Sequence, residues 1–254
     1  MKTFFAFLKK ELFESARSGK LTVLLIIFIL FGIMNPAIAK LTPWMLEIMA
    51  EELEGSGMIV TEVEVNAITS WVQFFKNIPM ALIAFVCIYG GIFTKEYTSG
   101  TLILILTKGL ARYKIVIAKT FHLLLFWSGG YFLCFAVTYG YNTYFWDNSV
   151  ANELIPTTLN WYLFGIFTVC LTVFFSVISK STSGVLLGTG GTVLISYLLE
   201  MIPKVKEYCP TRLMNTAHIA GGEMPSLNSA IAVTAALSLI CIAASIPIFN
   251  KKQL

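Results

Sequence analysis

The apolar residues of this 254-residue chain lie in long runs that are separated by short polar segments. Six runs approach or reach the roughly 20 residues with which a helix crosses the hydrocarbon core of a bilayer. The predicted transmembrane helices cover residues 21–39, 78–93, 115–139, 159–179, 184–202 and 230–249. The second run is short, and its ends are marked less sharply by polar residues. The pattern predicts an all-α integral membrane protein in which residues 1–254 form a single domain.

The first 20 residues have a two-sided pattern that differs from these uniform runs. On a helical wheel, one arc is apolar, and most of the remaining arc carries lysine, arginine and glutamate. A helix of this kind lies in the membrane interface with its apolar side toward the acyl chains. We therefore predict an interfacial helix over residues 1–20; the alternative is a solvated basic leader that only sets topology. The residues expected at the interface are Phe4, Phe5, Leu8, Leu12 and Arg17.

The charged residues around the six spans predict the orientation of the chain. With both termini on one side, that side carries 13 of the 18 lysine and arginine residues and 3 of the 14 acidic residues. Basic residues close to span ends stay on the cytoplasmic side of a membrane. We expect a multi-pass protein of a bacterial plasma (cytoplasmic) membrane, with the N- and C-termini in the cytoplasm.

The predicted outer loop over residues 40–77 is acidic. A short helix over residues 43–53, ended by Gly55 and Gly57, is expected within it. The loop is interpreted either as a solvated extracellular face or as a vestibule for cations or cationic substrates. Its glutamates are Glu47, Glu51, Glu52, Glu54, Glu62 and Glu64.

The composition narrows the possible functions. Hydrophobic residues make up 57% of the chain and charged residues only 13%, whereas about a quarter of an ordinary soluble domain is charged. This excludes a disordered chain and argues against a water-soluble enzyme. The five cysteines and two histidines form no C-x-x-C pair and no H-E-x-x-H motif, and the phosphate-binding G-x-x-x-x-G-K-[ST] is absent. We expect no metal site, no bound cofactor, no nucleic-acid partner and no enzymatic activity of this chain.

Few ionisable residues interrupt the apolar runs. Lys119, His122 and Glu200 are all expected near span ends. The Lys119 ammonium group is expected to reach the membrane interface, and His122 to be packed or hydrogen-bonded there. His218 is expected to be exposed in an outer loop. A secondary transporter would usually carry ionisable residues at mid-membrane, so the pattern disfavours that class.

Two glycines in the fifth span indicate close helix packing. Gly184 and Gly188 have the G-x-x-x-G spacing that lets helix backbones approach each other in lipid. We expect them at a helix contact, and the sharper hypothesis places this contact between two copies of the chain.

The segment between the second and third spans carries the most informative motif. It contains an acidic residue, a Gly-Thr-Leu triplet, alternating leucines, a polar residue, a glycine break and an arginine, followed by a lysine in the next span. These residues are Glu96, Gly100, Thr101, Leu102, Leu104, Leu106, Thr107, Gly109, Arg112 and Lys119. The pattern resembles the signature of ABC-2 type transporter permeases, although Gly109 and Leu110 stand where family members often have proline. The six spans, the amphipathic leader and the long loop before the last span extend the resemblance over the chain.

The resemblance implies an ABC-2 fold, like that of type V exporters, in which residues 95–112 form a coupling segment, a cytoplasmic helix that contacts an ATPase. The physical pattern agrees, because Leu102, Leu104 and Leu106 form an apolar patch, and such a patch marks a contact surface. The polar residues expected at the ATPase are Glu96, Lys108 and Arg112. The alternative is a segment that packs against the chain's own helices.

The resemblance also implies the function. The chain would be the transmembrane permease subunit of an ATP-driven ABC exporter, paired with a second permease chain, identical or homologous, and with separate cytoplasmic ATPase chains. ATP and Mg²⁺ would bind to those ATPase chains. The expected substrate is amphipathic or hydrophobic, with a membrane-active or toxin peptide as the leading candidate. A peptide-immunity or sensor subunit is the alternative function, and an ATP-independent secondary transporter is the second alternative.

Overall fold

The computed structural model describes residues 2–53, 65–107, 109–221 and 225–252. These residues form helices and connecting turns, and no strand occurs among them. The long helices are α1 (Lys2–Arg17), α2 (Lys20–Leu53), α3 (Ala67–Tyr89), α6 (Arg112–Phe145), α7 (Leu154–Ile178), α8 (Thr182–Glu200) and α9 (Asn228–Lys251). The short ones are α4 (Thr94–Ser99) and α5 (Thr101–Thr107), with the 3₁₀ turns η1 (Asn148–Val150), η2 (Lys206–Tyr208), η3 (Pro210–Met214) and η4 (Ala217–Ala220).

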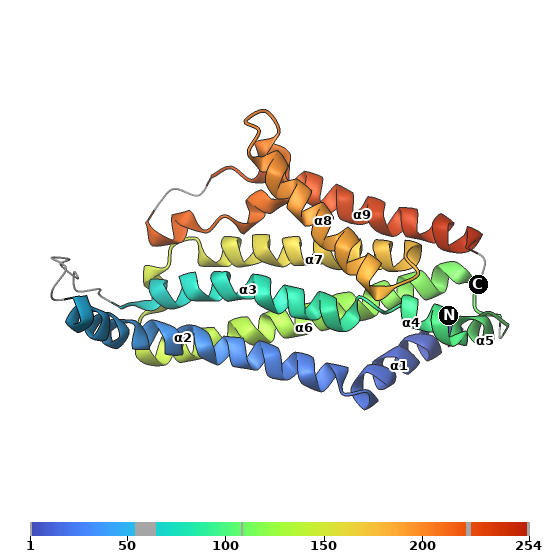
Figure 1. Ribbon diagram of the computed structural model, residues 1–254, viewed down its shortest axis with the longest axis horizontal. Helices are drawn as coiled ribbons and strands as arrows, with labels where there is room; N and C mark the ends of the chain where they lie inside the picture. Colours follow the sequence, from blue (N-terminus) through green and yellow to red (C-terminus); the bar gives the residue numbers. More distant parts are fainter. Residues whose placement is uncertain (1, 54–64, 108, 222–224, 253–254) are drawn as a thin grey trace.

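The described residues confirm that the chain forms six helices that could span a membrane. The helices α2, α3, α6, α7, α8 and α9 are each long and apolar enough to cross a membrane. Helices satisfy their backbone hydrogen bonds internally, which is what a segment in the hydrocarbon region requires. Figure 1 shows these helices running roughly along one direction, with α8 inclined to the others.

Two predicted boundaries are wrong. Helix α2 continues through Pro36 and Pro43 to Leu53, so the short helix predicted over residues 43–53 is part of the first long helix. Helix α3 begins at Ala67 rather than at residue 78. Its start is fixed by Asn66, whose Oδ1 accepts hydrogen bonds from the backbone N–H groups of Ile68 (3.0 Å) and Thr69 (3.3 Å). Gly55 and Gly57 lie outside the described residues.

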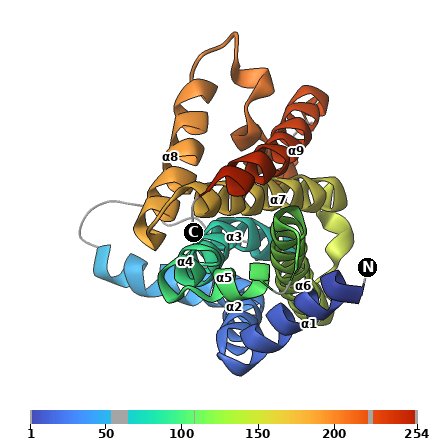
Figure 2. The same ribbon diagram turned by 90° about the vertical axis from the view of Figure 1, so that its right-hand side faces the viewer.

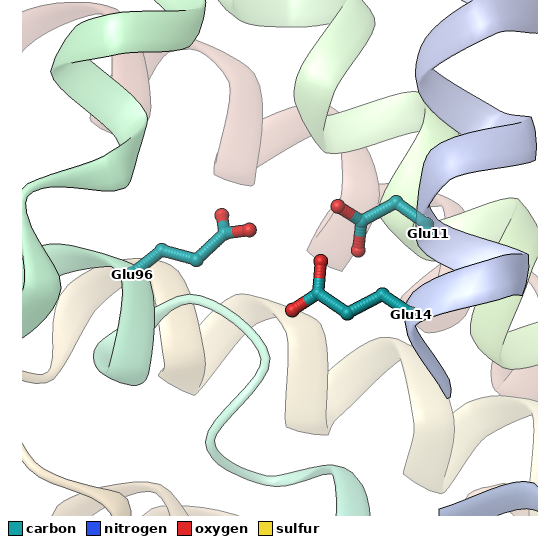
Figure 3. Close-up of side chains that lie close together, drawn as sticks. All are labelled: Glu11, Glu14 and Glu96. Atoms are coloured by element: carbon teal, nitrogen blue, oxygen red, sulfur yellow. The ribbon is translucent and has the colours of Figure 1, made fainter. Parts of the chain in front are cut away.

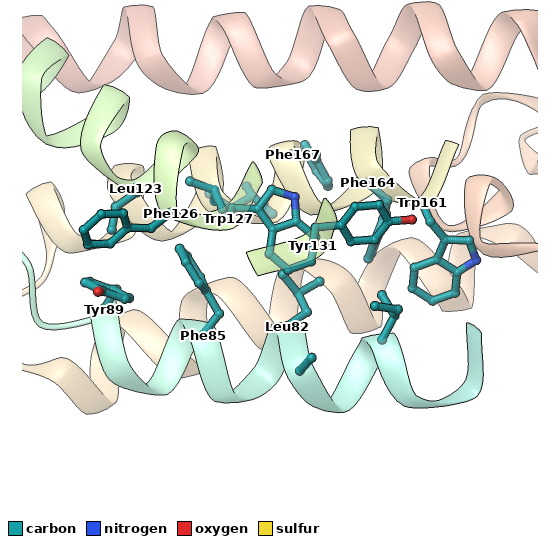
Figure 4. Close-up of a cluster of buried hydrophobic side chains, with 14 of the residues drawn as sticks. Leu82, Phe85, Tyr89, Leu123, Phe126, Trp127, Tyr131, Trp161, Phe164 and Phe167 are labelled. Atoms are coloured by element: carbon teal, nitrogen blue, oxygen red, sulfur yellow. The ribbon is translucent and has the colours of Figure 1, made fainter. Parts of the chain in front are cut away.

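The core of the bundle is aromatic. Helices α2, α3 and α6 pack together on one side of it, and α7 packs against α9, α8 and α6. Figure 4 shows the labelled rings of α3, α6 and α7 pointing toward one another. Trp127 lies at the centre of these contacts, with ring centroids 5.9 Å from Phe28, 5.8 Å from Phe85 and 5.4 Å from Tyr131. Gly165 permits the approach of α7, because any side chain there would clash with the Trp127 ring.

The predicted interfacial helix exists as α1, over Lys2–Arg17. The structure turns one of its faces inward, toward α6 and α2, so that Phe7 and Leu8 are buried. Phe4 and Leu12 are half-buried against the core, whereas Phe5 is 62% exposed and Arg17 is exposed. Part of the predicted apolar arc therefore packs against the protein, and part of it is exposed. The location of α1 at a membrane interface stays a prediction.

The connection between α8 and α9 folds back onto the bundle. Its 3₁₀ turns pack against α7, α8 and α9, with Leu213 and Ile219 buried. The prediction that His218 is exposed is wrong: it is buried, and its Nε2 lies 2.6 Å from Thr157 Oγ1. Burial also lowers the pKa of His218. His218 is buried because it is adjacent to Ile219, which packs into the bundle.

The glycines of α8 pack within the chain. A side chain at Gly188 would meet the ring of Phe175 on α7, and one at Gly184 would meet Ser179 in the preceding turn. Gly188 thus lies at a helix contact, as predicted, and its neighbour there is Phe175. The sharper hypothesis of a contact between two chains stays a prediction.

Candidate functional site

The predicted coupling segment folds as two short helices at the end of the bundle that holds α1 and the last turn of α9 (Figures 1 and 2). Helix α4 ends because Gly100 adopts a left-handed conformation (φ 67°), which glycine reaches without the cost that a side chain imposes. Helix α5 starts again at Thr101. A second left-handed glycine, Gly109 (φ 82°), stands before α6. The two glycines thus separate α4, α5 and α6 into distinct helices.

The leucines of α5 do not all point outward. Leu104 is 65% exposed and its neighbour Ile103 is 47% exposed. Leu106 is half-buried against the core. Leu102 is 1% exposed, so the prediction that it takes part in an outer contact is wrong. The exposed apolar surface of the segment is therefore formed by Ile103 and Leu104; Gly100 is half-buried, Thr101 is exposed, and Lys108 lies outside the described residues.

Arg112 was expected to face a partner, and the structure gives it an internal role. Its guanidinium group donates hydrogen bonds to the backbone carbonyl oxygens of Phe249 (2.9 Å), Asn250 (3.0 Å) and Lys252 (2.7 Å). These are carbonyls at the C-terminal end of α9, where a cation compensates the negative end of the helix dipole. Arg112 therefore fastens the first turn of α6 to the end of α9.

Glu96 also points inward, contrary to its predicted place at an ATPase contact. It is 8% exposed, and its Oε2 lies 3.0 Å from the Nζ of Lys119. The Nζ of Lys119 donates to Glu11 Oε2 at 2.9 Å, and Lys119 is only 1% exposed. The expectation that this lysine reaches toward the membrane interface is therefore wrong. Lys119 instead joins α1, α4 and α6 through two carboxylates.

A second lysine completes this charge cluster, which consists of Lys10, Glu11, Glu14, Glu96 and Lys119. The Nζ of Lys10 lies 3.1 Å from Glu11, 2.7 Å from Glu14 and 3.4 Å from Glu96. Figure 3 shows Glu11 and Glu14 of α1 pointing toward Glu96 of α4. Charges taken out of water are costly unless they are paired, and here each buried member has an opposite charge beside it.

The pKa shifts in α1 follow from this pairing. Burial alone would raise the pKa of Glu11, but the positive charges of Lys119 and Lys10 outweigh it and hold that pKa below its usual value. Burial alone would lower the pKa of Lys10, and its carboxylate neighbours raise it instead. Glu11 and Lys10 are therefore charged at neutral pH, which maintains the cluster as a set of ion pairs.

The three carboxylates of the cluster could by spacing alone hold a metal ion, since their oxygens lie within 4.8 Å of one another. Two ammonium groups stand among them, at 2.9 Å and 2.7 Å from Glu11 and Glu14. Positive charge is thus already supplied by Lys119 and Lys10, and the cluster fits an internal salt-bridge network better than a metal site.

A polar pocket of about 70 Å³ adjoins the charge cluster. His122 lies in its wall, and its Nε2 is 3.1 Å from the hydroxyl of Ser15 on α1. The expectation that His122 is packed or hydrogen-bonded is confirmed. Sequence reasoning did not find Glu11 and Ser15; the signal available was their four-residue spacing, which places both on one face of α1 with Phe7.

The family-model comparison matches residues 46–254 to a model described as "Protein of unknown function (DUF2705)". The chain belongs to the DUF2705 family. No curated protein and no solved structure matches it. The DUF2705 match begins within α2, so it includes Glu96, Lys119 and the whole coupling segment. The helix α1, which supplies Glu11, precedes the matched region.

Proposed function

We propose that this DUF2705 protein is the transmembrane permease subunit of an ATP-driven exporter and that it works with a separate ATPase chain. One observation carries the proposal: α5 presents Ile103 and Leu104, 47% and 65% exposed, at the end of the bundle. An apolar surface of this kind marks a contact with another molecule. In the proposed orientation, with the basic segments and both termini inside, this surface faces the cytoplasm.

The connections of the coupling segment support its proposed role. Glu96 ties α4 to Lys119 of α6 and, through it, to Glu11 of α1. At the other end of the segment, Arg112 holds the end of α9. A movement imposed on α4 and α5 by an ATPase would therefore act on three long helices. The motif resemblance and the contacts thus agree on the same segment.

The proposed substrate is amphipathic or hydrophobic, with a membrane-active peptide as the leading candidate. A groove of about 460 Å³ lies between α3, α7 and α8. Its lining is almost entirely apolar and includes Ile83, Phe164 and Leu194. Such a lining suits an apolar chain better than a small ion. A second permease chain, with ATP and Mg²⁺ bound on the ATPases, completes the proposed assembly.

A secondary transporter would place ionisable groups along the pathway at mid-membrane. The buried Lys119 is an ionisable group of the kind that this class requires. It lies about two turns after the start of α6 at Arg112, beside α1 and α4, and its charge is taken up by Glu11 and Glu96. This position favours a structural connection near the end of the bundle over an ion pathway.

The test replaces the most exposed leucine of the coupling segment. We expect Leu104→Asp to abolish co-purification of an ATPase from the native host and to abolish transport, because the partner's apolar surface would bury a charge at a cost of several kcal/mol. The bound protein is identified by its nucleotide-binding motif and by ATP hydrolysis. Tyr144→Asp is the matched control, since Tyr144 is 82% exposed at the opposite end of α6. Full ATPase binding and transport by Leu104→Asp would contradict the proposal.

A further inference from the structure

A cleft of about 250 Å³ lies directly behind the exposed surface of the coupling segment. Three separate parts of the chain form it: α4 with α5, the turn between α7 and α8, and the end of α9. Tyr97 and Glu96 come from α4, and Leu102 and Ile103 from α5. Lys180 of the turn and Lys252 after α9 supply its basic groups.

Lys252 is hydrogen-bonded in this cleft. Its Nζ donates hydrogen bonds to the carbonyl oxygens of Val177 (2.5 Å), Ile178 (3.2 Å) and Ser179 (3.3 Å) at the end of α7. The same Nζ lies 3.9 Å from the centroid of the Tyr97 ring. All three N–H donors are thereby used, so Lys252 contributes a fixed positive charge and no free donor.

Lys180 places a second positive charge beside the first. Burial lowers the pKa of Lys252, and the nearby charge of Lys180 lowers it further. Among the described residues, ion pairs to carboxylates are made by Lys10 and Lys119 and by neither cleft lysine. Glu96 lines the cleft, but its carboxylate is engaged by Lys119 and Lys10. In the described part of the cleft, neither Lys180 nor Lys252 is therefore paired with a carboxylate.

We infer that this cleft receives an acidic side chain, aspartate or glutamate, of the partner ATPase, next to the apolar contact made by Ile103 and Leu104. The inference rests on the proposed function and names the chemistry of the partner's docking residue. Lys180, which is exposed, would donate hydrogen bonds to the carboxylate. Lys252 would add attraction from its fixed position, and Ile103 would exclude water from the pair.

The position of the cleft favours a protein over a lipid headgroup. Figure 2 looks onto the end of the bundle, and α4, α5 and the end of α9 lie near the middle of the view, with α2, α6 and α8 around them. Lipid surrounds the sides of a transmembrane bundle, whereas the middle of its end faces the aqueous phase. An anion therefore reaches this cleft from the solvent side. Because an exposed apolar surface lies beside the cleft, a docked protein is the source that fits both features.

The experiment reverses the charge of Lys180. We expect Lys180→Glu to weaken binding of the purified ATPase to the full chain in nanodiscs by about tenfold or more, because a carboxylate would face the docked acid. Lys9→Glu is the control: it makes the same change of net charge on an exposed residue of α1 at the same end. We expect that variant to bind within about twofold of wild type, since long-range effects of exposed charges are screened by salt.

The outcomes separate the inference from the proposed function. If wild type binds the ATPase, Leu104→Asp does not, and Lys180→Glu binds like Lys9→Glu, the inference is overturned and the proposed function stands. If no ATPase binds to wild type, both are overturned.

Nanodiscs of neutral phosphatidylcholine are compared with discs that contain phosphatidylglycerol. An effect of Lys180→Glu confined to the phosphatidylglycerol discs would assign the cleft to a lipid headgroup and would also overturn the inference. Restoration of Lys180→Glu binding by one acidic-to-lysine change in the ATPase would support it.

Discussion

The amino group of Lys119 lies at a site that is 1% exposed, and it pairs with two carboxylates from other helices. Breaking a buried ion pair by removing one partner is far more costly than removing the whole set, because the remaining charges are left uncompensated. In this cluster, loss of the Lys119 ammonium group would leave Glu11, Glu14 and Glu96 with only the more exposed ammonium group of Lys10. The stability of α1 and α4 on the bundle should therefore depend on this one side chain.

We expect Lys119→Met to lower the free energy of unfolding by about 3–5 kcal/mol, measured by denaturant titration in detergent micelles. The triple variant Glu11→Gln, Glu96→Gln and Lys119→Met should recover much of that loss, since it removes the charges together. Lys95→Met is the control, because Lys95 is an exposed lysine next to Glu96. A Lys119→Met protein as stable as Lys95→Met would show that the cluster does not stabilise the fold.

At the scale of the elements, α8 and α9 are the least buried of the six long apolar helices, and the contact of α8 with α7 depends on a small residue. Gly188 lies against the ring of Phe175, whereas nothing lies within 4 Å of a side chain placed at Gly190, two residues further along. The two glycines are thus a matched pair within one helix. One of them is needed for packing inside the chain and the other borders open space.

We expect Gly188→Leu to destabilise the protein by about 1–3 kcal/mol, because the added side chain forces α8 away from Phe175. Gly190→Leu should change stability far less. Thermal unfolding of both variants in the same detergent measures the difference, and Phe175→Ala combined with Gly188→Leu should restore part of the stability. Equal loss from the two glycine variants would mean that insertion of leucine into α8, rather than the α7 contact, is the cause.

At the scale of the whole molecule, the six spans place α1, α4, α5 and the end of α9 at one end, and the turns after α6 at the other (Figure 1). The excess of basic residues at the first end predicts that this end faces the cytoplasm. Cys209 would have been a natural reporter for the other side. It is only 2% exposed, and burial raises the pKa of its thiol, so it is a poor target for labelling reagents.

We expect an introduced cysteine at Tyr144 to be labelled by an impermeant maleimide on intact cells, and one at Arg17 to be labelled only after permeabilisation. Both positions are exposed, and they lie at opposite ends of the bundle. The background should carry Cys87→Ser, since Cys87 is the exposed native cysteine among the described residues. Labelling of position 17 but not of position 144 on intact cells would reverse the orientation.

The sequence by itself determined the six spans and their order, since a bilayer fixes the length of a spanning helix and each helix satisfies its own backbone. It also singled out the segment that forms α4 and α5, because glycines and alternating leucines are local signals. It could not determine which leucine faces outward: Leu102 is buried and Leu104 exposed, and that depends on how α5 rotates against the core.

The tertiary structure alone decided the partners of the charged residues. Lys119 and Glu11 are 108 positions apart, and Lys10 and Glu96 are 86 apart, so no local pattern links them. Likewise, Arg112 donates hydrogen bonds to carbonyl oxygens at the end of α9, and Lys252 to carbonyl oxygens at the end of α7. In each case, a charged group that is removed from water needs an opposite charge or the end of a helix dipole beside it. Only the packing of distant helices determines which of these lies nearest.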